Sequence, residues 1–166
     1  MQMSNRQFQI TALGLVALCF TGTASAQEMT RFEIIAECTQ TIQRSAIYRD
    51  QPDAERYSNL FVEDGVIVIG SNATEGRDAI AERVRTSDPS ELDRHLTGSI
   101  VVDIDDSGSI TAKSYALIYE GVTPESPGSV PATEYLMADY DDQMVMTESG
   151  CKFVRRQVTM IFSGDS

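Results

Sequence analysis

His95 is the residue best suited to proton-transfer chemistry, and it is the one histidine in the chain. An imidazole changes charge near neutral pH, so a well-placed histidine can take a proton from a substrate and return it. A carboxylate that accepts a hydrogen bond from the ring would fix its tautomer, and the chain has 25 acidic residues. Taken without other information, a single histidine is better explained as a structural or solvent-facing residue than as a catalyst.

Several other catalytic patterns are missing from the sequence. The segment 70–76 lacks the G-x-x-x-x-G-K pattern of a phosphate-binding loop, and neither G-x-S-x-G nor His-Glu-x-x-His occurs in the chain. One histidine and two widely separated cysteines, Cys38 and Cys151, do not make a zinc set. We therefore expect no metal and no cofactor.

The first 26 residues have the pattern of a secretory signal peptide. Arg6 precedes a short apolar run at 10–20, and Ala24-Ser25-Ala26 supplies small side chains at a cleavage site. The run is shorter than the roughly 20 residues that cross a bilayer. We predict a signal peptide at 1–26 and a single mature domain at 27–166, periplasmic or secreted. An uncleaved N-terminal anchor is the alternative.

The charge of the chain excludes some partners. The formal net charge is −12, whereas nucleic-acid backbones require clustered Lys and Arg. We expect no nucleic-acid partner and, after signal cleavage, no membrane partner. Two cysteines remain in the mature chain; an exported protein could pair Cys38 with Cys151, or both could be buried thiols.

Periodicity predicts helices first and strands afterwards. A largely apolar stripe at spacings of 3 and 4 predicts a helix over 30–48, and shorter helices are expected over 54–61 and 76–84. A polar loop at 70–75 follows a short β-branched strand at 66–69, and a second loop is expected over 87–93. Four longer strands are expected at 95–104, 110–120, 132–146 and 151–162. This order predicts an α+β fold with helices on one face of a curved sheet, and the space between them would hold a ligand.

Six short blocks of the sequence, in order, resemble those of SnoaL-like domains, a branch of the NTF2-like superfamily. The first block combines YRDQPD (48–53) with LFVEDG (60–65). The other five are GRDAI (76–80), RHLT (94–97), AKSY (112–115), YDD (140–142) and GCKFVRR (150–156). The resemblance implies a cone in which three N-terminal helices pack on a curved, mainly antiparallel sheet that encloses a cavity. Cys151 stands where the family usually has tryptophan, and Cys38 is its candidate partner in a disulfide.

The resemblance also points to candidate site residues. Catalytic members of the family commonly place an Asp and a His in the cavity, and the matching positions here are Asp50 and His95. Tyr48 is a further candidate, as a hydrogen-bond donor to a developing oxyanion. Tyr115 and Tyr119 on one strand face, or Glu120 on the other, are candidates for ligand binding, because alternate strand residues face opposite sides. Arg155 and Arg156 likewise face opposite ways, so one of them could pair with an anionic group at the cavity mouth.

Two functions from different classes follow. The first is a cofactor-free lyase or isomerase, such as a dehydratase or cyclase, that acts on a small, largely apolar molecule with His95 as the base and Asp50 as its orienting partner. The second is a non-catalytic module that binds a ligand or forms dimers. A homodimer through the exposed sheet face is expected in either case, because such dimers are ordinary in the family.

Overall fold

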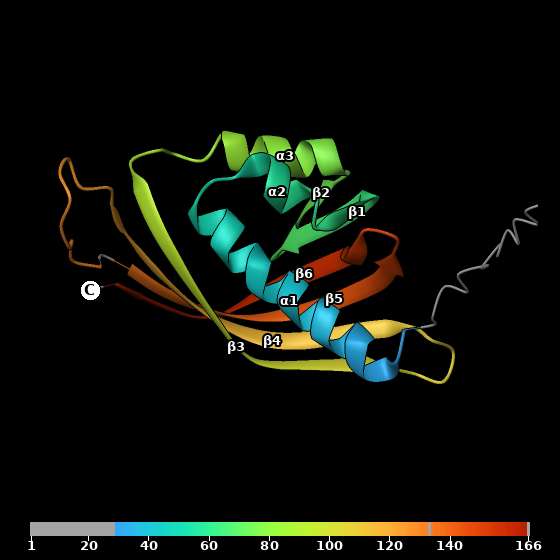
Figure 1. Cartoon of the computed structure of the whole chain (residues 1–166). Coiled ribbons are helices and arrows are strands. Elements are labelled where there is room, and N and C mark those ends of the chain that lie inside the picture. Colours follow the sequence, from blue (N-terminus) through green and yellow to red (C-terminus); the bar gives the residue numbers. More distant parts are fainter. Residues whose placement is uncertain (1–28, 133, 166) are drawn as a thin grey trace, which may run out of the picture.

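The computed structural model describes residues 29–132 and 134–165 (Figure 1). The predicted signal peptide lies outside the described residues, so its existence stays a prediction. None of the helices in the described ranges is long and apolar enough to cross a membrane.

Three helices precede most of the sheet, as predicted. α1 (Arg31–Asp50) begins at a capping box, in which Thr30 and Glu33 each bind the backbone N–H of the other. α2 (Ala54–Ser58) is capped by Asp53, whose Oδ1 accepts from the backbone N–H of Arg56 at 3.0 Å. α3 (Arg77–Arg85) follows Gly76.

Six strands form one sheet in the order β2-β1-β6-β5-β4-β3. β1 pairs with β6 in parallel, and the other neighbours are antiparallel. The α+β prediction is confirmed. The strand bounds are Phe61–Ile69 (β1), Asn72–Glu75 (β2), Glu91–Ile104 (β3), Ile110–Val122 (β4), Glu134–Thr147 (β5) and Gly150–Asp165 (β6).

Three strand boundaries differ from the prediction, because backbone pairing between strands decides them and local composition does not. β1 begins at Phe61, which the sequence had placed in a helix, because Phe61 lies opposite Phe153 of β6. The polar segment predicted as a loop contains β2, an edge strand held by backbone pairing with β1. β3 begins at Glu91 inside the second predicted loop and pairs there with Val122.

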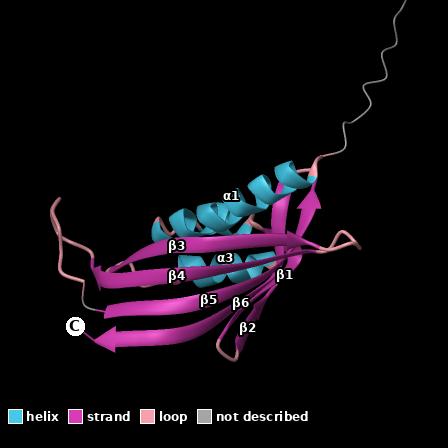
Figure 2. Cartoon of the chain, turned by 90° about the horizontal axis from the view of Figure 1, so that it is seen from below, coloured by secondary structure: helices cyan, strands magenta, loops and turns pink. Residues whose placement is uncertain are grey.

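The sheet has one covered face and one open face. α1 runs diagonally across the inner face, while α2 and α3 pack beside β1 (Figure 1). In the view from below, the helices of residues 29–132 and 134–165 all lie on the other side of the sheet from its outer face (Figure 2). Bulges occur in β1, β3 and the β5–β6 pair, and bulges bend and twist strands. The sheet therefore curves around a core that includes Ile42, Phe61 and Phe153.

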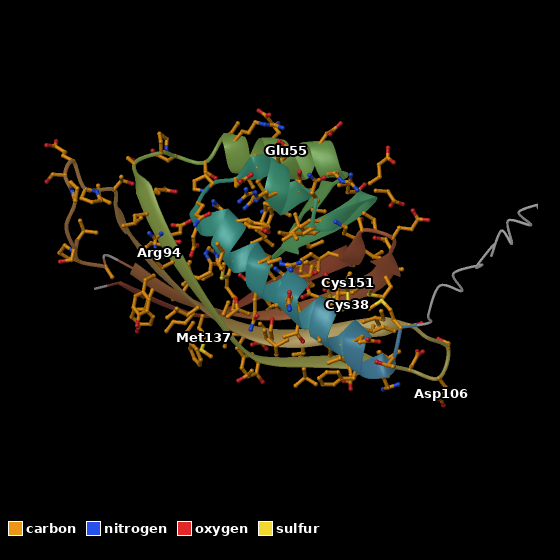
Figure 3. The ribbon with its side chains drawn as sticks, in the orientation of Figure 1. Cys38, Glu55, Arg94, Asp106, Met137 and Cys151 are labelled. Carbon is orange, nitrogen blue, oxygen red and sulfur yellow. A yellow bond between two sulfur atoms is a disulfide. The ribbon has the colours of Figure 1, made fainter. Side chains whose placement is uncertain are left out.

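A disulfide joins Cys38 of α1 to Cys151 of β6, with their Cα atoms 5.0 Å apart (Figure 3). Both residues are buried in the core between the helix and the sheet. Of the two alternatives that the sequence left open, the structure has the disulfide. The bond ties the helix that carries Asp50 to the strand that carries Arg156.

Candidate active site

Asp50 and His95 meet where the end of α1 lies against β3. Asp50 is the last residue of α1, and one carboxylate oxygen lies 2.6 Å from His95 Nδ1. The backbone N–H of His95 donates to the same carboxylate at 3.0 Å. Because a carboxylate only accepts, the short contact assigns a proton to Nδ1 and leaves Nε2 as the nitrogen that can act on a ligand. Both side chains are nearly buried, at 12% and 13% exposure.

His95 lines a cavity of about 170 Å³ between the helices and the concave face of the sheet. Asp50 does not line this cavity and stands behind the imidazole. About half of the wall is aliphatic, and that half suits the apolar part of a ligand. The apolar side chains of the wall are Ile67, Ile69, Val84, Ile118, Leu136, Val158 and Met160.

Arg156 and Asp142 form a second buried pair at the wall of the cavity. The guanidinium donates to both carboxylate oxygens at 2.8 Å and to Ser45 Oγ at 2.7 Å. Its carbon lies 4.1 Å and 4.6 Å from the ring centroids of Phe153 and Tyr140. Burial lowers the pKa of Arg156, but the adjoining Asp142 outweighs it and the pKa is raised, so Arg156 stays charged. The predicted role for one arginine, binding an anion at the mouth, does not fit Arg156, because Asp142 already occupies it. Arg155, the other candidate, does not line the cavity and instead lies within hydrogen-bond distance of Gln157.

Two tyrosines present their phenols to the same space. Tyr57 of α2 and Tyr140 of β5 both line the cavity, and within the described residues neither hydroxyl makes a hydrogen bond to protein. Burial raises the pKa of Tyr57, and it raises the pKa of Tyr140 to about 12. Both phenols therefore remain protonated and able to donate a hydrogen bond to a ligand.

The candidate donor Tyr48 is not in the cavity. It packs against the core and lies under Arg56, whose guanidinium carbon is 5.8 Å from the ring centroid. Residues two apart on a helix point about 200° away from each other. Tyr48 therefore faces away from the side of α1 that carries Asp50, and the role predicted for it is wrong on this geometry.

The candidate ligand-binding residues of β4 lie on opposite faces of the sheet, because alternate strand residues point to opposite sides. Tyr115 and Tyr119 are 42% and 41% exposed on the outer face, so they cannot contact a ligand inside, and that prediction is corrected. Ile118 and Glu120 share the opposite face and line the cavity. The structure thus brings Glu120 and His95 to one cavity; ligand binding by Glu120 stays a prediction.

Tyr57, Tyr140 and Asp142 are site residues that sequence reasoning did not single out. Asp142 lies opposite Arg156 across the last hairpin, but a simple hairpin closed at Thr147 and Gly150 would place Asp142 opposite Arg155. The bulge after Gln143 shifts the register by one residue. Hairpin pairing of an acid with an arginine was the available signal, and the bulge decides which arginine points inward. No cluster of His, Cys, Asp and Glu suited to a metal ion occurs among the residues that the structure describes.

Comparison with known proteins agrees with this architecture. The fold resembles a type 2 hexachlorocyclohexane dehydrochlorinase (TM-score 0.66, 11% identity, 79% of this chain and 87% of that one). It also resembles an NTF2-like protein with a cystatin-like fold from Novosphingobium aromaticivorans (0.62, 23%, 78% and 83%) and ActVI-ORFA from Streptomyces coelicolor (0.62, 22%, 75% and 95%). At these identities the likeness shows the fold alone. No curated protein gives a significant match. Residues 30–157 match the family described as a SnoaL-like domain, and the chain belongs to that family.

Proposed function

We propose that the chain binds a small, largely apolar molecule in its cavity and catalyses a cofactor-free proton transfer of the lyase or isomerase type. The observation that carries the proposal is the 2.6 Å contact between Asp50 and His95 Nδ1 at the cavity wall. It leaves His95 Nε2 as a general base toward a ligand in the partly open cavity. A base and a hydrogen-bond donor in a dry pocket suffice to remove a proton next to a carbonyl group.

The two cavity phenols supply the donor. As a proton leaves the carbon next to a carbonyl, negative charge grows on the carbonyl oxygen. Tyr57 and Tyr140 would stabilise that charge by donating hydrogen bonds, since both stay protonated. His95 then returns its proton to carbon in an isomerisation or to a departing hydroxyl in a dehydration. Asp50 holds the imidazolium during this interval.

Proton exchange tests the proposal without knowledge of the natural substrate. The protein is incubated in D₂O with small cyclic ketones and β-hydroxy ketones, and NMR follows deuterium incorporation or loss of water. We expect turnover with at least one compound and a loss of about 100-fold or more in His95→Gln and Asp50→Asn. Asp103→Asn, an exposed acid on the same strand, is the control and should match wild type.

Binding without exchange would contradict the enzyme proposal. Thermal-shift screening of the same compounds reports binding separately. Ligands that stabilise wild type and His95→Ala equally, with no exchange in either, would favour the non-catalytic binding module.

We also propose that the protein is exported. The signal-peptide pattern of residues 1–26 and the Cys38–Cys151 disulfide support this together, because structural disulfides persist mainly outside the reducing cytoplasm. Mass spectrometry of the periplasmic and secreted fractions should find a mature chain that begins at Gln27 and has no free thiols after unfolding. A chain that keeps Met1, or two reactive thiols in the unreduced protein, would contradict export.

A further inference from the structure

Charged residues of the cavity wall come from both the helices and the sheet. The helices contribute Arg49 from α1 and Arg83 from α3, whereas the sheet contributes Asp93 from β3, Glu120 from β4 and Arg156 from β6. The charge of Arg156 is already balanced by Asp142. The cationic groups at this cavity that are not balanced by a hydrogen-bonded carboxylate are therefore the two on the helices. Their presence is notable in a chain whose formal net charge is −12.

Arg49 is only loosely engaged. Its Nη2 lies 3.6 Å from Asp93 Oδ2, which is beyond hydrogen-bond distance, and its side chain is 27% exposed. Arg156 makes three hydrogen bonds of 2.7–2.8 Å and is 2% exposed. Arg156 is therefore committed to the protein, while the N–H groups of Arg49 can bind a ligand at the cost of one long ion pair.

Arg83 is the second uncommitted guanidinium at the cavity. Its neighbour Arg85 pairs with Glu82 at 3.0 Å, but within the part of the chain that the structure describes no carboxylate lies within 4.0 Å of the Arg83 guanidinium. Arg83 lies on the turn of α3 that also places Val84 in the cavity wall.

Both arginines act on one buried group, the Tyr57 hydroxyl. Burial raises the pKa of Tyr57, and the positive charges of Arg156, Arg49 and Arg83 oppose that rise. Arg49, Arg83 and Tyr57 also line the same cavity. Two guanidiniums and a phenol O–H on the helices that line the cavity are three donor groups suited to a carboxylate.

We propose that Arg49, Arg83 and the Tyr57 hydroxyl form an anion subsite that takes the carboxylate of an otherwise apolar ligand. The ligand carboxylate replaces the long ion pair between Arg49 and Asp93, and Glu120 lies across the cavity on β4. The apolar remainder then lies against Ile118 and His95, and the Tyr140 hydroxyl is left as the donor to a developing oxyanion. This inference deepens the proposed function and rests on it for the identity of the cavity as the active site, but carboxylate binding can be measured without catalysis.

Benzoate and benzamide test the subsite, because they share size and shape and differ in charge. His95 is the one histidine, so its ring Cε1–H signal in NMR reports occupancy of the cavity directly. We expect benzoate to bind wild type at least about tenfold more tightly than benzamide, with an affinity that falls as salt is added. Arg49→Gln and Arg83→Gln should each weaken benzoate about tenfold or more and leave benzamide unchanged. Arg49→Lys should restore part of the benzoate affinity.

Arg85→Gln is the matched control, since it removes a guanidinium from the same helix outside the cavity wall. It should bind benzoate as wild type does. Equal affinities for benzoate and benzamide, no benzoate binding, or equal losses in Arg83→Gln and Arg85→Gln would overturn the subsite. If Arg49→Gln alone fails to fold, the Arg83→Gln result decides.

Failure of the subsite and failure of the proposed function give different results. Asp50→Asn should abolish deuterium exchange and keep benzoate affinity within about twofold. Arginine-dependent benzoate binding with no exchange in wild type would refute catalysis and keep the subsite. Deuterium exchange that depends on His95, with no preference for benzoate over benzamide, would support catalysis and refute the subsite.

Discussion

The inner and outer faces of the sheet differ in how their polar and apolar side chains are exposed to solvent. On the inner face, every polar group that carries the site is paired or directed into a cavity, as Asp50–His95 and Asp142–Arg156 show. On the outer face, large apolar side chains lie open to solvent, and the ion pair Lys113–Asp141 is about half exposed. Because strand residues alternate, neighbours in sequence such as Asp141 and Asp142 belong to these two different settings.

The outer face is itself divided along the strands. Strand register brings together an apolar group near the end of β4 and the start of β5, and Met137 within it projects away from the helices in Figure 3. We call this group the outer patch. Its members are Leu96, Tyr115, Leu117, Tyr119, Tyr135, Met137 and Phe162. Further along the strands the same face is polar, with Lys113, Asp141 and Arg155 around a shallow hollow.

The comparison teaches that burial changes the value of the same chemical contact. A carboxylate–cation pair exposed to water contributes little, because solvent screens it and the side chains lose freedom. A buried pair is costly to break, because the remaining charge is left without compensation. The inner face therefore depends on each partner, and the outer face tolerates change.

The largest expected effect is the loss of Asp142. Asp142→Ala leaves the buried Arg156 charge unpaired, so the free energy of unfolding in urea should fall by about 3–5 kcal/mol. Asp141→Ala, one residue away on the outer face, should cost less than about 1 kcal/mol. Similar losses in the two variants would contradict the distinction between the faces.

A smaller effect is expected at alkaline pH from Tyr140. Its pKa is raised from 10.0 to about 12 by burial, so the native state keeps a proton that the unfolded chain loses. Stability should be complete below about pH 10 and fall by up to about 3 kcal/mol as pH rises to about 12. Tyr140→Phe should remove this contribution to the pH dependence of the free energy of unfolding. Tyr119→Phe, on the outer face, is the control, and an equal change there would refute the assignment to Tyr140.

The sequence predicted this molecule unevenly, for physical reasons. Helix and strand order followed from periodicity, and the Thr30–Glu33 capping box marked the start of α1 correctly. The alternation of strand residues predicted that Tyr119 and Glu120 lie on opposite faces of the sheet. It could not predict which of the two faces is concave, because that depends on where α1 packs. The Asp50–His95 contact joins residues 45 positions apart, so it came from resemblance and not from local pattern. The role predicted for Tyr48 is wrong because helix geometry places its side chain away from that of Asp50.

The smallest of these effects concerns the outer patch. Contiguous exposed apolar surface of this kind marks an interaction site, and a second copy of the chain is the partner we expect. Phe162 is 61% exposed, and aromatic residues commonly anchor interfaces.

Phe162→Ser should weaken self-association about tenfold or more in sedimentation experiments. Val101→Ser removes a side chain that is 56% exposed outside the patch and should leave association unchanged. The His95 ring signals should be the same in both variants, because Phe162 and His95 lie on opposite faces of the sheet. A wild-type protein that stays monomeric at every concentration would refute the homodimer. A change in the His95 signals on dilution would instead show that the two faces are coupled.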